Sequence, residues 1–340
     1  MGRLAVAVIV SVASAALADV AQAGATLDAI KARQHLICGV DTALRGFSVS
    51  DAEGEWSGFD VDICRAIAAA VLGDPAKVRF EPTRTIVRFD FLRSGKIDVL
   101  SRNTTWTMSR ETELGLSFVA TVFYDGQGFL VSRKYGARSA RELDGATVCV
   151  QPGTTTELNV KEYFAANNLA FKPVIYETSD EVSATFFSGR CQVLTTDASK
   201  LAIFRKAFSP KGKQDDYVIL PEIVSKEPLA PAVRKGDGEW RDIVKWTIFA
   251  LIEAEEYGVT QSNVETMAKQ SANVAVRRLL GAAPTVSEAL GLEDDWVVKV
   301  IKAVGNYEEI WNRNFGPLGL QRGLNRLWSK GGLLYAPPLR

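Results

Sequence analysis

One short pattern occurs twice in this chain and constrains the fold more than any other feature. Residues 94–103 read SGKIDVLSRN, and residues 188–197 read SGRCQVLTTD. In each copy, Ser-Gly with a basic residue is typical of a helix end, and the apolar segment that follows predicts a short buried strand. Arg110 follows the first copy and Asp197 ends the second. The repeat therefore favours two similar lobes that offer opposite charges to a small zwitterion in a shared cleft. The alternative is chance, because a helix end followed by a strand is common in α/β proteins.

The order of the predicted elements agrees with two similar halves. Strands are predicted over 36–40, 78–80 and 97–100 in the first half, and over 147–150, 174–176 and 192–194 in the second. Helices are predicted between them, over 60–72, 89–93, 156–167 and 180–187, the first of these from apolar or small residues on one face. Strands that alternate with helices indicate mostly parallel sheets, so the predicted fold class is α/β with two lobes and a hinge.

Two segments are predicted to connect the lobes. Residues 124–131 have the apolar character of a crossing strand, and residues 223–233 are stiffened by Pro228 and Pro231. A helix with one apolar face, over 239–256, is expected to return the chain to the first lobe. The predicted division is therefore lobe 1 at 24–124 and 229–260, lobe 2 at 125–228, and a helical C-terminal extension at 261–340 packed on lobe 1.

The first 23 residues have the features of a secretory signal peptide. Arg3 supplies a positive charge, residues 4–17 are apolar or small, and Ala21-Gln22-Ala23 fits the small-x-small cleavage pattern. The sequence predicts cleavage after Ala23, with a weaker alternative after Ala18, and export to the periplasm. The remaining alternative is an uncleaved membrane anchor, for which the apolar run is short.

Charge and cysteine content narrow the classes of partner and site. The chain has 40 basic and 40 acidic residues, so no net charge favours nucleic acid or an anionic membrane. An exported chain with four cysteines suggests disulfides, for which three pairings are open. The predicted lobes favour Cys38–Cys64 and Cys149–Cys191, each within one lobe. A zinc site is the alternative, but the cysteines are widely spaced and His35 is the only histidine, so no metal site is expected.

Polar residues that follow the predicted strands form a candidate binding site. Residues 103–110, NTTWTMSR, are rich in hydroxyls and end in Arg110, whose planar guanidinium suits a carboxylate. Residues 151–156, QPGTTT, lie where a strand turns into a helix, a geometry that binds anions. Asp197 can accept hydrogen bonds from an ammonium. The alternatives are that the threonines only cap helices and that both charges are solvated on the surface.

Four phrases at and around these residues resemble one protein family. They read WSGFDVD at 56–62, RNTTWT at 102–107, YDGQGF at 124–129 and GTTTEL at 153–158. Together they are similar to the type II, family 3 periplasmic solute-binding proteins of polar amino acid ABC transporters. The general L-amino-acid-binding subfamily is the most similar, and the resemblance covers residues 27–340, including the C-terminal extension.

The resemblance implies a set of ligand-binding residues. Arg110 matches the arginine that holds the ligand α-carboxylate in this family, and Asp197 matches the aspartate that holds the α-ammonium. The polar loop before the arginine adds backbone and hydroxyl contacts, and the threonine of the Gly-Thr-Thr turn adds a carboxylate contact. Many relatives cover the ligand with an aromatic ring near position 44, a role that Phe47 or Trp106 would have to take here. The matching residues are Leu44, Arg102, Asn103, Thr105, Arg110, Thr155 and Asp197.

The resemblance also implies a non-catalytic, monomeric protein that needs no cofactor. It would capture free L-amino acids of broad range between its lobes and deliver them to the permease of an ABC transporter. The alternative is an enzyme on the same scaffold, such as a cyclohexadienyl dehydratase-like lyase. That reaction needs a positioned acid or base, which His35 and oxidised cysteines do not supply. A receptor sensor domain is a further alternative, and ion-channel activity is not expected.

Overall fold

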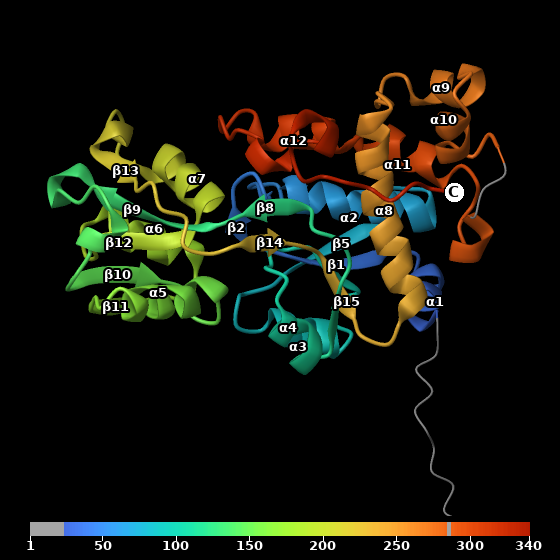
Figure 1. Ribbon diagram of the computed structural model, residues 1–340. Coiled ribbons are helices and arrows are strands. Elements are labelled where there is room, and N and C mark those ends of the chain that lie inside the picture. The colour runs from blue at the N-terminus through green and yellow to red at the C-terminus, as the bar shows by residue number, and fades with distance from the viewer. Residues whose placement is uncertain (1–23, 284–286) are drawn as a thin grey trace, which may run out of the picture.

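A computed structural model describes residues 24–283 and 287–340, so the predicted signal peptide lies outside the described residues. The chain forms two lobes, each built around one five-stranded sheet (Figure 1). The first sheet has the order β5-β1-β6-β15-β7, formed by Val78–Pro82, Leu36–Val40, Val99–Leu100, Ala232–Arg234 and Leu116–Phe118. The second has the order β11-β10-β12-β9-β13, formed by Phe171–Ile175, Ala146–Val150, Val193–Asp197, Gln127–Ser132 and Tyr217–Ile219.

The two sheets are built in the same way around a central parallel strand. In the first lobe β1 pairs in parallel with β5 and β6, and in the second β10 pairs in parallel with β11 and β12. The two copies of the sequence repeat supply β6 and β12, which therefore occupy equivalent places. Strand β12 extends to Asp197, beyond the predicted end at 194, because it also pairs with β9 as far as Gln127.

Helices cover both sheets. The five that the sequence predicts in the lobes lie within a few residues of their predicted bounds, whereas the helices at 25–33, 108–113 and 198–208 were not predicted. The helices of the first lobe are α1 (Ala25–Arg33), α2 (Phe59–Leu72), α3 (Arg88–Arg93), α4 (Met108–Glu113) and α8 (Gly238–Glu256). Those of the second lobe are α5 (Thr155–Ala166), α6 (Ser179–Phe187) and α7 (Ala198–Phe208). Gly58 begins α2 with a φ of 134°, and a Cβ at this position would lie 2.2 Å from the carbonyl oxygen of Phe47. The hairpin strands β2–β4 (Ala43–Leu44, Ser48–Ser50 and Trp56–Ser57) can approach α2 this closely only because the residue is glycine.

Two antiparallel strands, β8 (Phe123–Asp125) and β14 (Glu227–Leu229), run between the lobes (Figure 1). The prediction of one continuous strand over 124–131 was wrong, because the chain breaks at Gly126 between β8 and β9. A Cβ at Gly126 would lie 2.3 Å from Cγ2 of Ile223 and 2.8 Å from the carbonyl oxygen of Ser225. The second crossing segment therefore packs directly on the backbone of the first.

The C-terminal region packs mainly on the first lobe (Figure 1). Helix α11 (Trp296–Val304) packs on α2, and α12 (Tyr307–Phe315) packs on α2 and α8, while α9 (Val264–Gln270) and α10 (Val274–Leu279) lie beyond them. The ring of Trp311 stacks on Phe123 of β8 at 5.1 Å between centroids. A single hydrogen bond between described residues, from Lys206 Nζ to the Pro317 carbonyl (2.8 Å), joins this region to the second lobe.

The C-terminal region also holds the backbone of β8. The Tyr307 hydroxyl donates to the carbonyl of Val122 at 2.7 Å. The side chain of Asn325 accepts from the N–H of Tyr124 at 2.6 Å and donates to the carbonyl of the same residue at 3.0 Å. No helix in the described ranges has the length and apolar character needed to cross a membrane.

Both predicted disulfides are confirmed. Cys38 of β1 is joined to Cys64 of α2 with a Cα–Cα distance of 6.2 Å, and Cys149 of β10 is joined to Cys191 at 5.8 Å. Cys191 lies in the turn before β12 rather than in the strand, where it was predicted. The bonds span 26 and 42 residues, so restricting the unfolded chain contributes roughly 3–4 kcal/mol for each.

Candidate functional site

A small, polar cavity lies between the lobes and brings together six of the seven predicted ligand-binding residues. Its volume is about 30 Å³, and both lobes contribute to its lining. The predicted residues in it are Arg102, Asn103, Thr105, Arg110, Thr155 and Asp197. Those that the sequence reasoning did not select are Thr85, Arg88, Gln151, Thr154, Thr156, Thr196 and Lys200. None of these lining side chains is aromatic.

The first lobe supplies the polar loop between β6 and α4. Asp60, from the first turn of α2, fixes this loop by accepting hydrogen bonds from the Ser101 hydroxyl (3.2 Å) and the Asn103 backbone N–H (3.1 Å). Asn103 has a φ of 30°, a left-handed conformation that asparagine tolerates better than most residues. Burial raises the pKa of Asp60 to about 7. The Gly-Phe-Asp phrase at the start of α2 thus shapes the binding loop without touching the cavity.

Arg110 reaches the cavity from the first turn of α4. Thr107 caps this helix by accepting from the Arg110 backbone N–H at 3.3 Å. The guanidinium is 8 % exposed and donates to the carbonyl of Thr105 at 2.8 Å. Burial lowers the pKa of Arg110 to about 10, against the opposing charges of Glu227 and Asp197. The side chain therefore stays positively charged near neutral pH and is held in a fixed orientation.

Arg102 is already paired within the first lobe. Its guanidinium forms an ion pair with Asp41 at 2.6 Å and donates to the carbonyl of Thr83 and the hydroxyl of Thr85. Asp41 is buried, and its pKa is nonetheless lowered, because Arg102 and Lys200 outweigh the effect of burial. Arg102 thus lines the cavity mainly as a neutralised, structural group.

Asp197 lies at the end of β12, where the second lobe faces the cavity. The carboxyl group is 7 % exposed. Burial, together with the nearby charges of Asp125 and Glu227, raises its pKa well above the ordinary value. A buried carboxylate beside two other acids is strongly stabilised by a cation, so this position suits an ammonium group.

Glu227 is a buried residue beside the cavity that the sequence analysis did not select. It lies in β14, is 1 % exposed, and accepts hydrogen bonds from four side chains. Thr105 of the first lobe (2.5 Å) and Thr155 of the second (2.8 Å) both donate to its Oε2. Asn159 (2.7 Å) and Ser225 (2.6 Å) donate to its Oε1. While the two threonine hydroxyls donate to Glu227, they can only accept hydrogen bonds from a ligand.

Other hydrogen bonds also hold the lobes together around the cavity. Gln151 of the second lobe donates to the Thr85 hydroxyl of the first at 2.8 Å, and Arg88 donates to the carbonyl of Gly153 at 3.1 Å. Lys200, 5 % exposed, reaches the side-chain oxygen of Gln151 at 3.4 Å. The structure therefore has its lobes in contact. Lys200 follows the second copy of the repeat by three residues, the one sequence signal that pointed towards it.

Leu44 is the one predicted ligand-binding residue that does not line the cavity. It is fully buried in the hydrophobic core, where β2 packs on β3 and on α6 of the second lobe. Neither aromatic substitute takes its place. Phe47 packs against Phe59, Phe123 and Phe315 in the same core, and Trp106 stacks on Phe118 while donating to Glu111. In this arrangement of the lobes, neither Leu44 nor these two rings are among the residues that line the cavity, and a hydrophobic cover near position 44 stays a prediction.

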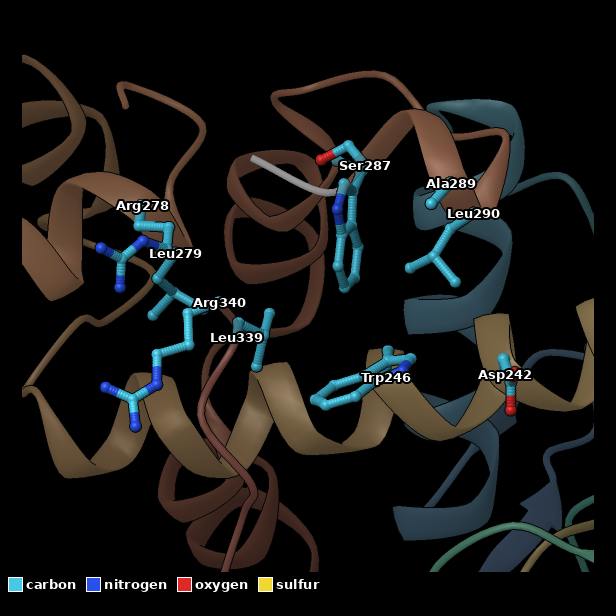
Figure 2. Close-up of a pocket in the computed structure, with 10 residues that line it drawn as sticks. Asp242, Trp246, Arg278, Leu279, Ser287, Ala289, Leu290, Leu339 and Arg340 are labelled. Atoms are coloured by element: carbon cyan, nitrogen blue, oxygen red, sulfur yellow. The ribbon is translucent and has the colours of Figure 1, made fainter. Parts of the chain in front are cut away.

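A second cavity, of about 270 Å³, lies in the C-terminal region. Figure 2 shows it between α8, which carries Trp246, and the segments that carry Leu290 and Leu339. No residue of the second lobe lines it, so movement of the lobes would not enclose a molecule there. Among residues 24–283 and 287–340, no three His, Cys, Asp or Glu side chains gather as metal ligands would.

Comparisons with known proteins point to one family. The sequence matches the bacterial extracellular solute-binding proteins, family 3, over residues 36–263. It is 53 % identical over 325 residues to the general L-amino acid-binding periplasmic protein AapJ of Rhizobium johnstonii, with 94 % of each chain covered. It is 52 % identical over 333 residues to the glutamate/glutamine/aspartate/asparagine-binding protein BztA of Rhodobacter capsulatus, with 97 % of this chain and 98 % of that one covered.

A solved structure agrees with this result. A periplasmic binding protein from Brucella ovis with glutathione bound is 53 % identical to this chain and superposes with a TM-score of 0.89. The match covers 93 % of this chain and 99 % of that one, so it includes the helical C-terminal region.

Proposed function

Because this chain belongs to the family 3 bacterial extracellular solute-binding proteins, we propose that it is the periplasmic amino-acid-binding component of an ABC transporter. The observation that carries the proposal is the placement of Arg110 and Asp197 in one cavity, from different lobes. An α-carboxylate on Arg110 and an α-ammonium on Asp197 would pair each ligand charge with a buried partner of opposite sign. These groups are common to all amino acids, which accounts for a broad range of ligands.

The two lobes support a mechanism of capture by closure. Since ligand contacts come from both lobes, binding stabilises the closed form over the open one. In our proposal the lobes comprise residues 24–124 with 229–260, and residues 125–228. They turn about β8 and β14, and the closed monomer then docks on the membrane permease. Removal of residues 1–23 as a signal peptide would release the protein into the periplasm.

We propose binding without catalysis. The lining residues include no histidine or cysteine, and all four cysteines are in disulfides. His35 lies before β1, where its ring contacts the carbonyl of Arg33. In this proposal Asp197, the carboxylate among these lining residues, is paired with the ligand ammonium and is therefore not free to act as a base.

The proposal is tested by thermal unfolding with each of the twenty amino acids and with glutathione. A ligand that binds only the folded state at one hundred times its Kd adds about 2.7 kcal/mol to the free energy of unfolding. We expect several L-amino acids to stabilise the protein, and their decarboxylated or N-acetylated analogues to have little effect. Mass spectrometry of the released ligand should show an unchanged mass. A panel without any stabilising amino acid, or a ligand recovered as a product, would refute the proposal.

Glu227 provides a test of closure itself. Replacing Glu227 by alanine removes the acceptor shared by Thr105 and Thr155, so the closed form loses bonds that the open form can replace with water. We expect the Kd of every amino acid to rise by about tenfold, in an unchanged order, because fewer molecules are competent to close. Calorimetric titration measures this effect, and small-angle scattering of the unliganded variant should show a more open average shape.

The matched control is Glu222→Ala. Glu222 lies just before the crossing segment that contains Glu227, and its carboxylate accepts from Ser139 and from the backbone of Ala140, both in the second lobe. It should leave ligand affinity within about threefold of the wild type, as expected away from the contact between the lobes. Equal losses in both variants would show that Glu227 has no special part in closure.

A further inference from the structure

Three acidic side chains gather where the strands that join the lobes meet the cavity. Asp125 of β8 and Glu227 of β14 are directly opposite each other in an antiparallel pair, which places their side chains on one face with Cβ atoms about 5 Å apart. Asp197 joins them from β12, since the backbone N–H of Ser199, two residues further on, donates to Oδ1 of Asp125 at 3.3 Å. Among the described residues, none of the three carboxyl groups is in an ion pair. Like charges placed so closely destabilise each other.

Two of the three acids have room for a proton. Glu227 accepts hydrogen bonds from four side chains, which occupy the lone pairs of both its oxygens. Oδ1 of Asp125 accepts from the backbone N–H groups of Gly126 and Ser199. Its buried Oδ2 has no hydrogen-bond partner in the described part of the chain. A buried carboxylate oxygen without a donor is costly, whereas a protonated one becomes a donor itself. A proton on the cluster is therefore left to Asp125 and Asp197.

The cations that face Asp197 do not remove the need for this proton. They lie on three helices and attract its carboxylate: Lys200 in α7, Arg110 in α4 and Arg88 in α3. Burial and the two neighbouring acids outweigh them, together with a hydrogen bond from the Asn103 side chain, so the pKa of Asp197 is raised well above its ordinary value. Burial raises the pKa of Asp125 as well. Two carboxyl groups placed in this way titrate as a pair that holds one proton.

We propose that Asp125 and Asp197 share one proton in the ligand-free protein, and that the ammonium group of an amino acid displaces it on binding. The inference rests on the proposed function, because it takes the α-ammonium to pair with Asp197. In this step the O–H bond of the carboxyl group breaks and the proton passes to the solvent. The ammonium keeps its three hydrogens and donates to the carboxylate that remains, so no bond of the ligand forms or breaks.

Capture of an amino acid then depends on pH in one direction. The carboxyl pair holds its proton more tightly in the ligand-free protein than in the complex, so a fall in pH favours the ligand-free form. Affinity is therefore full above the raised pKa of the pair and is lost as the pH falls through it. Release of one proton corresponds to about a tenfold change in Kd for each pH unit below that pKa.

Calorimetric titration of the full mature chain with neutral amino acids, L-glutamine first, tests the inference. The side chains of these ligands do not titrate, and each ligand is measured in two buffers of different ionisation enthalpy at about pH 5.5 and about pH 7.5. At the lower pH we expect about half a proton to one proton to be released for each ligand bound, and a Kd at least about threefold higher than at the upper pH. A heat of binding that is the same in both buffers at the lower pH would overturn the inference.

Asp125→Asn tests whether the proton is shared. The asparagine can keep Oδ1 as the acceptor for Gly126 and Ser199, and it places a permanent N–H donor where Oδ2 lies. Asp197 then has one acidic neighbour fewer, so its pKa should fall. We expect proton release at the lower pH to drop to less than half of the wild-type value, and the ratio of the two Kd values to move towards one. The matched control is Asp215→Asn, the same change at an exposed aspartate of the second lobe, which should keep the wild-type proton release.

The remaining outcomes separate this inference from the proposed function. Asp60 is another buried acid with a raised pKa, and it holds the backbone of Asn103 beside the cavity. Unchanged proton release in Asp125→Asn would assign the titration to a different group, Asp60 among them, and would contradict the shared proton. If Asp125→Asn does not fold, the presence or absence of proton release in the wild type still decides. Failure of every neutral amino acid to bind at either pH refutes the proposed function instead.

Discussion

Replacement of Arg110 by alanine is expected to raise the Kd of every amino acid ligand by roughly 30-fold to several thousand-fold. The guanidinium is buried and fixed by its bond to the Thr105 carbonyl, so it can meet a ligand carboxylate without reorganisation. Truncating one partner of a buried, hydrogen-bonded charge pair costs about 2–5 kcal/mol, and about 1.4 kcal/mol corresponds to tenfold in Kd. Because every amino acid carries the α-carboxylate, the loss should not depend on the side chain.

Calorimetric titration with several amino acids measures this effect, and two variants control for it. Arg110→Lys keeps the charge but loses the planar pair of donors, so its affinities should fall between those of the wild type and the alanine variant. Arg45→Ala removes an exposed arginine of the first lobe that does not line the cavity and should change little. If Arg110→Ala still binds most ligands within threefold of the wild type, the carboxylate is held elsewhere.

Replacement of Trp311 by alanine is expected to lower the free energy of unfolding by roughly 3–5 kcal/mol, the range for removing a large aromatic from a core. The side chain is 2 % exposed. It stacks on Phe123 of β8, which joins the C-terminal region to the first lobe, and contacts Phe315 within α12 at 4.8 Å between ring centroids. No part of it lines the binding cavity, so the order of ligand preference should be unchanged.

Chemical denaturation followed by circular dichroism measures this change, with Trp328→Ala as the matched control. Trp328 is also in the C-terminal region but is 55 % exposed, and its loss should cost about 1 kcal/mol or less. Similar losses in both variants would mean that the packing of α12 contributes little to stability. A changed ligand order in a folded Trp311→Ala protein would mean that the C-terminal region influences the binding site.

The parts of the fold that depend on local sequence were predictable. The repeat around Ser94 and Ser188 combines a helix end with a buried strand, and both copies form the strand beside the central one of their sheet. The disulfides followed from placing each cysteine pair within one lobe. The break at Gly126 was not predictable from the apolar character of 124–131, because it depends on the backbone of Ser225, about a hundred residues away in the sequence.

The candidate site was only partly predictable, for a similar reason. Asp197 ends β12, and Arg110 lies in the helix that follows β6 and its polar loop, places where sequence reasoning expects ligand contacts. The importance of Glu227 comes from donors in two distant segments, Thr105 in one and Thr155 with Asn159 in the other, that converge on it only in the folded chain. Leu44 shows the opposite case: the resemblance implied a ligand contact, whereas the folded chain buries this side chain in the core, which its position along the sequence does not reveal.

The hydrogen bonds between the C-terminal region and the backbone of β8 limit where the connection between the lobes can bend. Asn325 binds both backbone groups of Tyr124, and Tyr307 binds the carbonyl of Val122, so β8 is clamped to the first lobe up to its penultimate residue. The next two residues, Asp125 and Gly126, accept hydrogen bonds from Ser199 and Ala198 of the second lobe instead, so the connection passes from one lobe to the other at this point. Strand β8 would therefore move with the first lobe, and the second lobe would turn about the C-terminal end of this strand. Rotation of the second lobe would then move its side of the cavity as a unit, without disturbing the C-terminal helices that pack on the first lobe.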